Sequence, residues 1–291
     1  MGVEGVGVFL VLGGSGNLGS ALLRFFELSG TSCLAPSSAE LNVLSRDAIS
    51  KYFIQNGPKI KAIINCIAWT DVDGCERNPE KAFEVNSIAP AHMANVAQYI
   101  GVPFIQISTD YVFDGKGGSP YSEDHPTNPI QVYGQSKDHG DRAVLMRGGC
   151  VARVQWILGQ SKKNFVTWVI DALKSQTPIN LSTLQMGGPT SCAWLSERIG
   201  DLINHTTLTG IYHLVHDDYV NRYDCGLFIS EVLNLPHEGV LVPVDHVNFG
   251  IAKRPENTML SNKHTKTLLR AVGSEWSWRE DLTDYLRGKC V

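Results

Sequence analysis

The sequence lacks several features that would assign it to a specialised class of protein. No apolar run reaches the roughly 18 to 20 residues that a membrane-spanning helix needs, so no membrane association is expected. Lys and Arg (25) do not outnumber Asp and Glu (29), and the formal net charge of −4 gives no basic surface for nucleic acid. The apolar N-terminal stretch carries Glu4 and no basic residue, which indicates a strand and not a signal peptide. We therefore expect a cytoplasmic protein.

The cysteines and histidines show no ligand spacing. Seven cysteines are an odd number and include no Cys-x-x-Cys pair, which favours reduced thiols over a disulfide framework or a zinc site. The one close histidine pair, His213 and His216, falls in an apolar run that predicts a strand. Side chains three apart in a strand point to opposite faces, so shared metal ligation is not expected there. The sequence predicts no metal site.

Apolar runs alternate with helical patterns through the first half of the chain. Asn78 followed by Pro79 is a strong start signal for one of the helices. Strands alternating with helices indicate an α/β fold with a Rossmann-type, doubly wound parallel sheet. The expected strands cover residues 6–14, 31–36, 61–68, 102–109 and 150–159.

The alternation loosens after about residue 160. Shorter strand-like stretches then mix with helical patterns near 164–175, 193–205 and 222–234. We predict a dinucleotide-binding domain over 1–160, with later returns to it near 190–216. Residues 161–291 are expected to form mainly a smaller, interleaved substrate-binding lobe.

A glycine loop joins the first expected strand to the first expected helix. Gly13, Gly16 and Gly19 allow a tight turn and a close approach of the backbone to a pyrophosphate at the helix N-terminus. The second strand then runs into Pro-Ser-Ser, with Ser37 where an acid would exclude a 2′-phosphate. This favours NADPH, with NADH possible. The alternative is that Glu40 reaches the adenosine ribose.

Two Tyr-x-x-x-Lys pairs occur, and the spacing alone is weak evidence. Tyr133 and Lys137, in "YGQSK", follow a strand that ends in a hydroxyl residue, Thr109. Tyr285 and Lys289, in "YLRGK", have no such strand before them and lie on an amphipathic helix. We predict that the first pair is catalytic and the second structural. The alternative for the first pair is a solvated helix face.

The string "STDYVFDG", followed by "SPYSEDHPTNPIQVYGQSK", closely resembles the dTDP-4-dehydrorhamnose reductase family of extended short-chain dehydrogenase/reductases. Further likeness is found in "IAWTDVD" (67–73), "QMGGPT" (185–190) and "RPENTML" (254–260). The resemblance covers most of the chain. It implies an NAD(P)H-dependent reduction at C4 of a nucleotide-linked 4-keto-6-deoxy sugar, with dTDP as the favoured nucleotide.

The resemblance also implies roles for individual residues. Asn17, Asn42 and Gln131 differ from the usual Gln, Asp and Asn, and these departures leave the sugar and the cofactor preference open. Arg254 could bind the nucleotide phosphates or fix a loop through carboxylate neighbours. The implied cofactor contacts are Gly16, Asn17, Leu18, Asn42, Val43, Ala68, Trp69, Thr70 and Lys137, the implied substrate contacts are Thr109, Asp110 and Trp156, and the implied catalytic group is Thr109, Tyr133 and Lys137.

In the expected mechanism, Tyr133 protonates the carbonyl oxygen as hydride reaches C4. Lys137, one helical turn away, would lower the pKa of Tyr133 and hold the nicotinamide ribose, while Thr109 would donate a second hydrogen bond to the oxygen. Two alternatives remain open. One is a nucleotide-sugar epimerase or dehydratase with tightly bound NAD. The other is a non-catalytic dinucleotide-binding subunit, since the regulatory β subunit of methionine adenosyltransferase is similar too. We expect a monomer or a homodimer.

Overall fold

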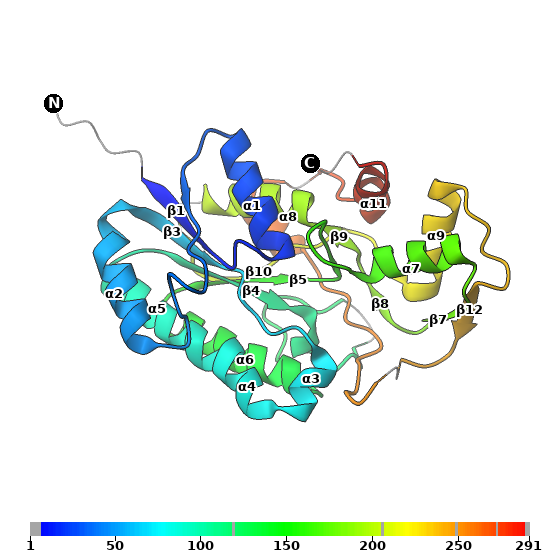
Figure 1. Ribbon diagram of the computed structural model, residues 1–291, viewed down its shortest axis with the longest axis horizontal. Helices are drawn as coiled ribbons and strands as arrows, with labels where there is room; N and C mark the ends of the chain where they lie inside the picture. Colours follow the sequence, from blue (N-terminus) through cyan, green and yellow to red (C-terminus); the bar gives the residue numbers. More distant parts are fainter. Residues whose placement is uncertain (1–6, 118–119, 205–206, 248–249, 272, 289–291) are drawn as a thin grey trace.

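A six-stranded parallel sheet forms the centre of the protein (Figure 1). The computed structural model describes residues 7–117, 120–204, 207–247, 250–271 and 273–288. The strand order is β10-β5-β4-β3-β1-β2, and every neighbouring pair is parallel. The predicted doubly wound sheet is confirmed. Its strands are β1 (Val8–Leu12), β2 (Cys33–Leu34), β3 (Ile60–Asn65), β4 (Phe104–Thr109), β5 (Cys150–Val154) and β10 (Gly210–His213).

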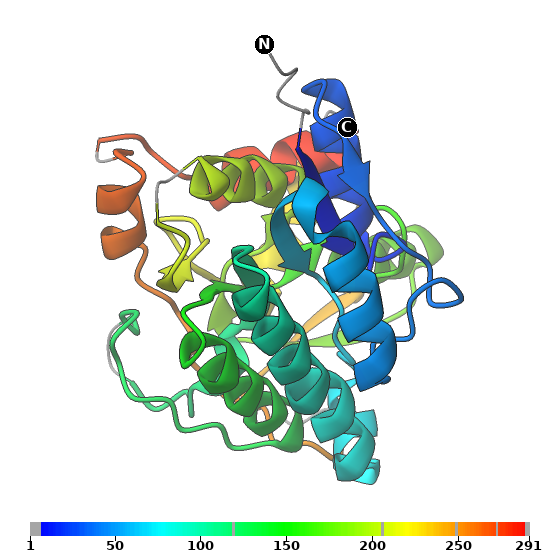
Figure 2. The ribbon, with the colours of Figure 1, turned by 90° about the vertical axis from the view of Figure 1, so that its left-hand side faces the viewer.

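Helices cover both faces of this sheet (Figures 1 and 2). One face packs against α1 (Asn17–Leu28) and α8 (Cys192–Ile203), through Leu22 and Leu195 among others. The other packs against α2 (Arg46–Asn56), α5 (Ala89–Tyr99) and α6 (Val132–Leu145). Burial on both faces explains why the strands consist of almost continuous apolar runs.

The helix expected from Asn78 is interrupted. The Asn78 side chain caps it by accepting from the amide of Lys81, and Pro79 is its first residue, as predicted. The segment then runs as α4 (Pro79–Phe83), a π-helical turn (Glu84–Ile88) and α5, preceded by the short α3 (Val72–Arg77). Turns of this kind often lie at functional sites.

Small strand pairs and helices form a second group beyond the sheet (Figure 1). Parallel β7 and β12, the strand β11, and helices α7, α9 and α11 share an apolar cluster that includes Trp278, and β8 pairs antiparallel with β11. The predicted boundary near residue 160 stays a prediction. The bounds are β6 (Ile157–Leu158), α7 (Phe165–Ser175), β7 (Ile179–Ser182), β8 (Met186–Gly187), β9 (Thr190–Ser191), β11 (Val220–Asn221), α9 (Arg222–Leu233), β12 (Leu241–Val244), α10 (Lys263–Leu268) and α11 (Trp278–Leu286).

Candidate active site

A cleft of about 460 Å³ lies where strands of the sheet end at their carboxyl termini. Ligands bind at this edge in open α/β sheets. One wall is formed by the loop before α1 and by the ends of β3, β4 and β5, and the other by the segment from Trp156 to Phe165 and by Arg222. The predicted site residues that line it are Gly16, Asn17, Leu18, Gly19, Ala68, Thr70, Thr109, Asp110, Tyr133, Lys137 and Trp156.

The glycine loop has the backbone needed to bind a pyrophosphate. Gly13 has a φ of +82°, which favours glycine. A Cβ on Gly19 would lie 2.2 Å from the carbonyl oxygen of Gly13, so the turn requires a residue without a side chain. Helix α1 begins after Gly16 with no side-chain cap on its first amides. Free amides at a helix N-terminus are suited to the phosphates of a dinucleotide, and the loop therefore fits NAD(P)H.

Helix α6 brings Tyr133 and Lys137 to the cleft beside the end of β4. The helix is capped by Gln131, whose Oε1 accepts from the amide of Gly134 at 3.1 Å. Both Tyr133 and Lys137 are buried. Nζ of Lys137 donates to the carbonyl of Ile107 at 2.7 Å, and the Thr109 hydroxyl donates to Oδ1 of Asp110 at 3.0 Å. The three residues predicted to be catalytic thus line one cleft.

The pKa of Tyr133 is raised, whereas the sequence argument expected Lys137 to lower it. Burial is the largest cause and a hydrogen bond with the Thr109 side chain partly opposes it, while the charge of Asp110 raises the pKa further. Burial also lowers the pKa of Lys137, which weakens its ability to stabilise a phenolate. The phenol is therefore held protonated at neutral pH, as a proton donor must be.

Asn86, in the π-helical turn, connects α6 to the loop after β3. Its Oδ1 accepts from the amide of Trp69 at 2.8 Å, and its Nδ2 donates to the carbonyl of Trp69 and to Oγ of Ser136, each at 3.1 Å. A Cβ on Gly140 would lie 2.2 Å from the carbonyl oxygen of Asn86, so α6 packs directly on this turn. The sequence argument missed Asn86, because the apolar period alone does not reveal a π turn.

Several predicted residues do not line the cleft. Arg254 forms an ion pair with Asp73 at 3.0 Å, which fits the alternative that it fixes a loop, and its substrate role stays a prediction. Ser37 donates through its amide and its hydroxyl to the Glu40 carboxylate, both at 2.8 Å. The other predicted cofactor residues outside the cleft lining are Gly13, Asn42, Val43 and Trp69.

Trp156 interrupts the strand expected over 150–159. Its φ of +35° is unusual for a bulky residue, and β5 ends before it while β6 begins after it. The indole lies so close to Gly187 that a Cβ there would be 2.6 Å from the ring. Arg222, which the sequence argument did not select, lies over the same ring with its guanidinium carbon 3.4 Å from the ring centroid. Lys162, Lys163, Asn164 and Phe165 also line the cleft and were also missed.

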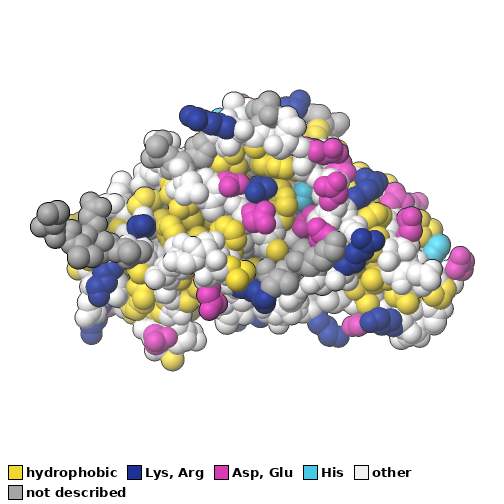
Figure 3. Space-filling model, turned by 90° about the horizontal axis from the view of Figure 1, so that it is seen from above, with side chains coloured by type: hydrophobic (Ala, Val, Ile, Leu, Met, Phe, Trp, Pro, Cys, Tyr) yellow, Lys and Arg dark blue, Asp and Glu magenta, His cyan; other side chains and the backbone are white. Residues whose placement is uncertain are grey.

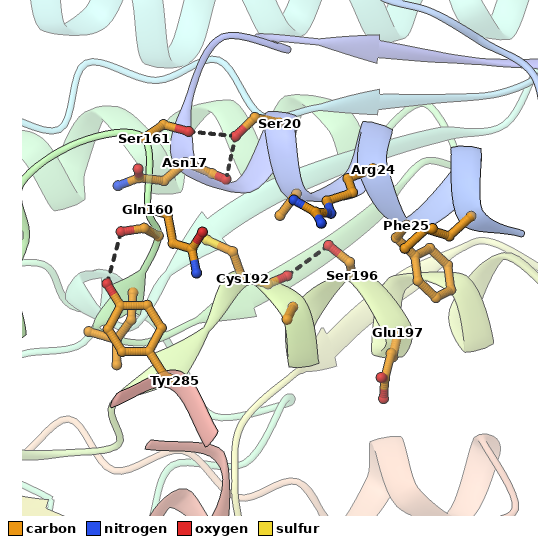
Figure 4. Close-up of a pocket in the computed structure, with 15 residues that line it drawn as sticks. Asn17, Ser20, Arg24, Phe25, Gln160, Ser161, Cys192, Ser196, Glu197 and Tyr285 are labelled. Atoms are coloured by element: carbon orange, nitrogen blue, oxygen red, sulfur yellow. Dashed lines mark hydrogen bonds between the residues drawn. The ribbon is translucent and has the colours of Figure 1, made fainter. Parts of the chain in front are cut away.

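A second cavity, of about 360 Å³, lies on the other side of Asn17, between α1, α8 and α11 (Figure 4). Tyr285 lines this cavity, and its hydroxyl donates to the carbonyl of Gly159 and accepts from Nδ2 of Asn164, both at 3.0 Å. These contacts fit the predicted structural role of Tyr285. Its predicted companion, Lys289, lies outside the described residues.

Three further properties concern the described residues and their surface. Among the described residues, no helix has the length and apolarity required to cross a membrane, and no group of three or more His, Cys, Asp or Glu side chains is placed to hold a metal ion. On the face shown in Figure 3, Lys and Arg side chains are interspersed with Asp and Glu.

A parallel sheet with a glycine loop before α1 and a buried Tyr-x-x-x-Lys pair on α6 defines an extended short-chain dehydrogenase/reductase, a class of NAD(P)H-dependent oxidoreductases. The family model described as "RmlD substrate binding domain" matches residues 8–289. The chain therefore belongs to the dTDP-4-dehydrorhamnose reductase family, as the sequence motifs predicted.

Similar proteins include reductases and a subunit of methionine adenosyltransferase. The dTDP-4-dehydrorhamnose reductase of Streptomyces griseus is 36% identical over 212 residues, 70% of this chain and 69% of the relative. The methionine adenosyltransferase 2 subunit beta of Xenopus laevis is 33% identical over 271 residues, 86% and 79% of the two chains. The dTDP-4-dehydrorhamnose reductase of Bacillus anthracis, solved in complex with NADP, has a TM-score of 0.88 and 28% identity, covering 97% of this chain and 99% of its own.

Proposed function

We propose that this protein is an NAD(P)H-dependent reductase of a nucleotide-linked 4-keto-6-deoxy sugar. The observation that carries the proposal is the meeting of Thr109, Tyr133 and Lys137 in one cleft with the glycine loop. The reductases of Streptomyces griseus and Bacillus anthracis support the reaction, and the second of them supports NADP as the cofactor type. We take NADPH as the cofactor, with NADH possible.

The residues of the cleft divide the work of a carbonyl reduction. The bound cofactor would supply hydride to C4 of the sugar. The buried Tyr133 phenol, kept protonated by burial, gives its proton to the carbonyl oxygen as negative charge develops there. The Thr109 hydroxyl, which donates to Asp110 in this structure, would turn to donate to the same oxygen. Trp156 and Asp110, which line the same cleft, would orient the sugar.

Lys137 and the loop before α1 would hold the cofactor. The amides that follow Gly16 would bind the pyrophosphate, and Ala68 and Thr70 line the same cleft. Lys137, fixed by its hydrogen bond to the Ile107 carbonyl, would donate to the nicotinamide ribose. Ser37 lies three residues after β2, and a 2′-phosphate bound there would take the place of the Glu40 carboxylate on the Ser37 amide and hydroxyl.

The test is NADPH oxidation, followed at 340 nm, with dTDP-4-keto-L-rhamnose and with its UDP and GDP counterparts. Oxidation with at least one sugar supports the reductase. The nucleotide of the best substrate then identifies the nucleotide that the enzyme prefers. No oxidation with any of the three would refute the proposal.

The second candidate is a non-catalytic dinucleotide-binding subunit, favoured by the 33% identity to the methionine adenosyltransferase subunit. It predicts NADPH binding without turnover, together with tight binding to a partner enzyme. The epimerase or dehydratase alternative predicts NAD that stays bound through purification. Absorbance and cofactor content of the purified protein separate it from the reductase.

We also propose a cytoplasmic location and a monomer or homodimer. The charge balance and the expectation of reduced cysteines support the location. Cell fractionation and light scattering of the purified protein test these two points.

A further inference from the structure

Arg222 is the least explained charged group in the cleft. It is the first residue of α9, in the part of the chain farthest in sequence from the glycine loop among the cleft residues. The fold brings it to the wall of the cleft beside Trp156, where the nearby Asp110 carboxyl acts to raise its pKa. Burial acts more strongly and lowers that pKa to about 10, so Arg222 is still a cation at neutral pH.

The guanidinium lies against two aromatic rings, whose planes are tilted by 55° to each other. Its carbon lies 3.4 Å from the ring centroid of Trp156 and 4.4 Å from that of Phe165. Nε donates to Oε1 of Gln185 at 3.3 Å, and Nε2 of Gln185 in turn donates to the Tyr111 hydroxyl at 3.1 Å. Stacking and this one hydrogen bond fix the plane of the side chain. The outer edge of the guanidinium is therefore held in one orientation before a ligand binds.

Hydrogen-bond donors remain without partners at this position. Nη1 of Arg222 and Nε1 of Trp156 are both buried, and neither has a hydrogen-bond partner among the described residues. The described part of the chain also places no carboxylate in an ion pair with Arg222. A buried, unpaired donor on a cation is costly, so its retention on a cleft wall indicates an acceptor supplied by a ligand.

The charges around the cleft indicate what that acceptor is. Among the described residues that line the cleft, the cations are Lys137, Lys162, Lys163 and Arg222, whereas Asp110 is the one acid. Lys162 lies at the glycine loop, where its amide donates to Oδ1 of Asn17 at 2.8 Å. Lys163 forms an ion pair with Asp171 at 3.2 Å, and Lys137 donates to the Ile107 carbonyl. Arg222 is thus the cation of the lining that lies at Trp156, and a planar guanidinium fork is suited to phosphate oxygens.

We propose that Arg222 binds the β-phosphate of the nucleotide sugar, the phosphate joined to the sugar, and so selects nucleoside diphosphate substrates. Two bonds separate C1 of the sugar from this phosphorus. A sugar with its ketone at Thr109 and Tyr133 therefore carries the phosphate within reach of a residue beside Asp110 and Trp156. The inference deepens the proposed function, from which it takes the nucleotide sugar as ligand.

The test is equilibrium binding by calorimetry with dTDP, UDP and GDP, each beside its monophosphate, so that no turnover is needed. Arg222→Met keeps an unbranched apolar chain against the rings but removes the charge and the donors. This substitution should weaken binding of the diphosphate that the wild type prefers by roughly 10- to 100-fold, and binding of the monophosphate by less than about threefold. Arg222→Lys should bind the diphosphate with an affinity between those of the wild type and Arg222→Met, because it keeps the charge and loses the planar fork.

Arg279→Met is the matched control. Arg279 also stacks on a tryptophan, 4.5 Å from the Trp278 ring centroid, but does not line the cleft, so its loss should change neither affinity. Wild-type diphosphate affinity in Arg222→Met, or equal loss of both nucleotides, would overturn the inference. So would a wild-type protein that binds none of the three diphosphates. If Arg222→Met does not fold, undiminished diphosphate binding by Arg222→Lys would overturn the inference.

The outcome is independent of the reductase assay. Selective loss of diphosphate binding in a protein that never oxidises NADPH would support the role of Arg222 and refute the proposed function. Turnover by the wild type, together with undiminished diphosphate binding in Arg222→Met, would support the proposed function and refute the role of Arg222.

Discussion

Replacing Tyr133 by Phe removes a single oxygen from the cleft. The remaining ring can keep its edge-to-face contact with Tyr111, whose centroid lies 6.1 Å away. Thr109 keeps two hydrogen bonds, to Asp110 and from the amide of Tyr111, so no partner is left unsatisfied. The cost in stability should therefore be about 1 kcal/mol, the value of one hydrogen bond. The loss of the proton donor should be much larger, about 10²- to 10⁴-fold in kcat, or about 3 to 5 kcal/mol of transition-state stabilisation.

The assay is steady-state NADPH oxidation with the best keto sugar, together with thermal unfolding. We expect KM to change little, because the phenol acts in the transition state and contributes little to ground-state binding. In the wild type, the raised pKa of Tyr133 should keep kcat from falling between pH 7 and 9, since the phenol stays protonated there. Tyr285→Phe is the matched control and should retain wild-type turnover. If Tyr133→Phe turns over at the wild-type rate, Tyr133 is not the proton donor.

Three further predictions concern other parts of the molecule. Lys137→Met should lower kcat and raise the KM for NADPH, each by roughly tenfold or more, and unchanged constants would contradict its role. Gly19→Ala should weaken NADPH binding, measured by fluorescence, roughly tenfold or more, because the new Cβ meets the Gly13 carbonyl, whereas Gly188→Ala, with 3.7 Å to its nearest neighbour, should bind normally. Burial lowers the pKa of His213 to about 3, so its contribution to stability is present above pH 6.5 and is lost as pH falls towards 3. Between pH 7 and 5, the free energy of unfolding measured in urea should fall by about 2 kcal/mol more in the wild type than in His213→Asn. An equal fall in the two proteins would contradict this prediction.

Much of the fold could be predicted because its signals are local. The apolar runs of β1, β3 and β4 are buried on both faces, and a strand of that kind is readily detected in a sequence. The cap at Asn78 and the turn at Gly13 depend only on neighbouring residues. The break at Trp156 could not be predicted, since its positive φ is imposed by packing against segments remote in sequence.

The residues of the candidate site likewise include some that local sequence signals reveal and others that they do not. Thr109, Tyr133 and Lys137 could be selected because they lie close together in the chain and resemble a known string. Arg222 comes from a remote helix and has no spacing that relates it to Tyr133. Arg254 lies in a recognisable motif, but its charge is matched by Asp73 from the other end of the chain. Pairings of that kind are set by the tertiary fold.

The position of β10 and α8 has a consequence for biosynthesis. Leu195 and Ile199 of α8 cover Val11 and Ile105 of the sheet, yet they are translated after α7 and β7. While the ribosome makes those elements, the part of this face that α8 covers stays exposed beside α1, and the edge of β5 has no partner. Exposed apolar faces and open strand edges are prone to aggregate. We therefore expect the nucleotide-binding part to complete its folding only after much of the second lobe has emerged, unlike a pair of domains joined in tandem.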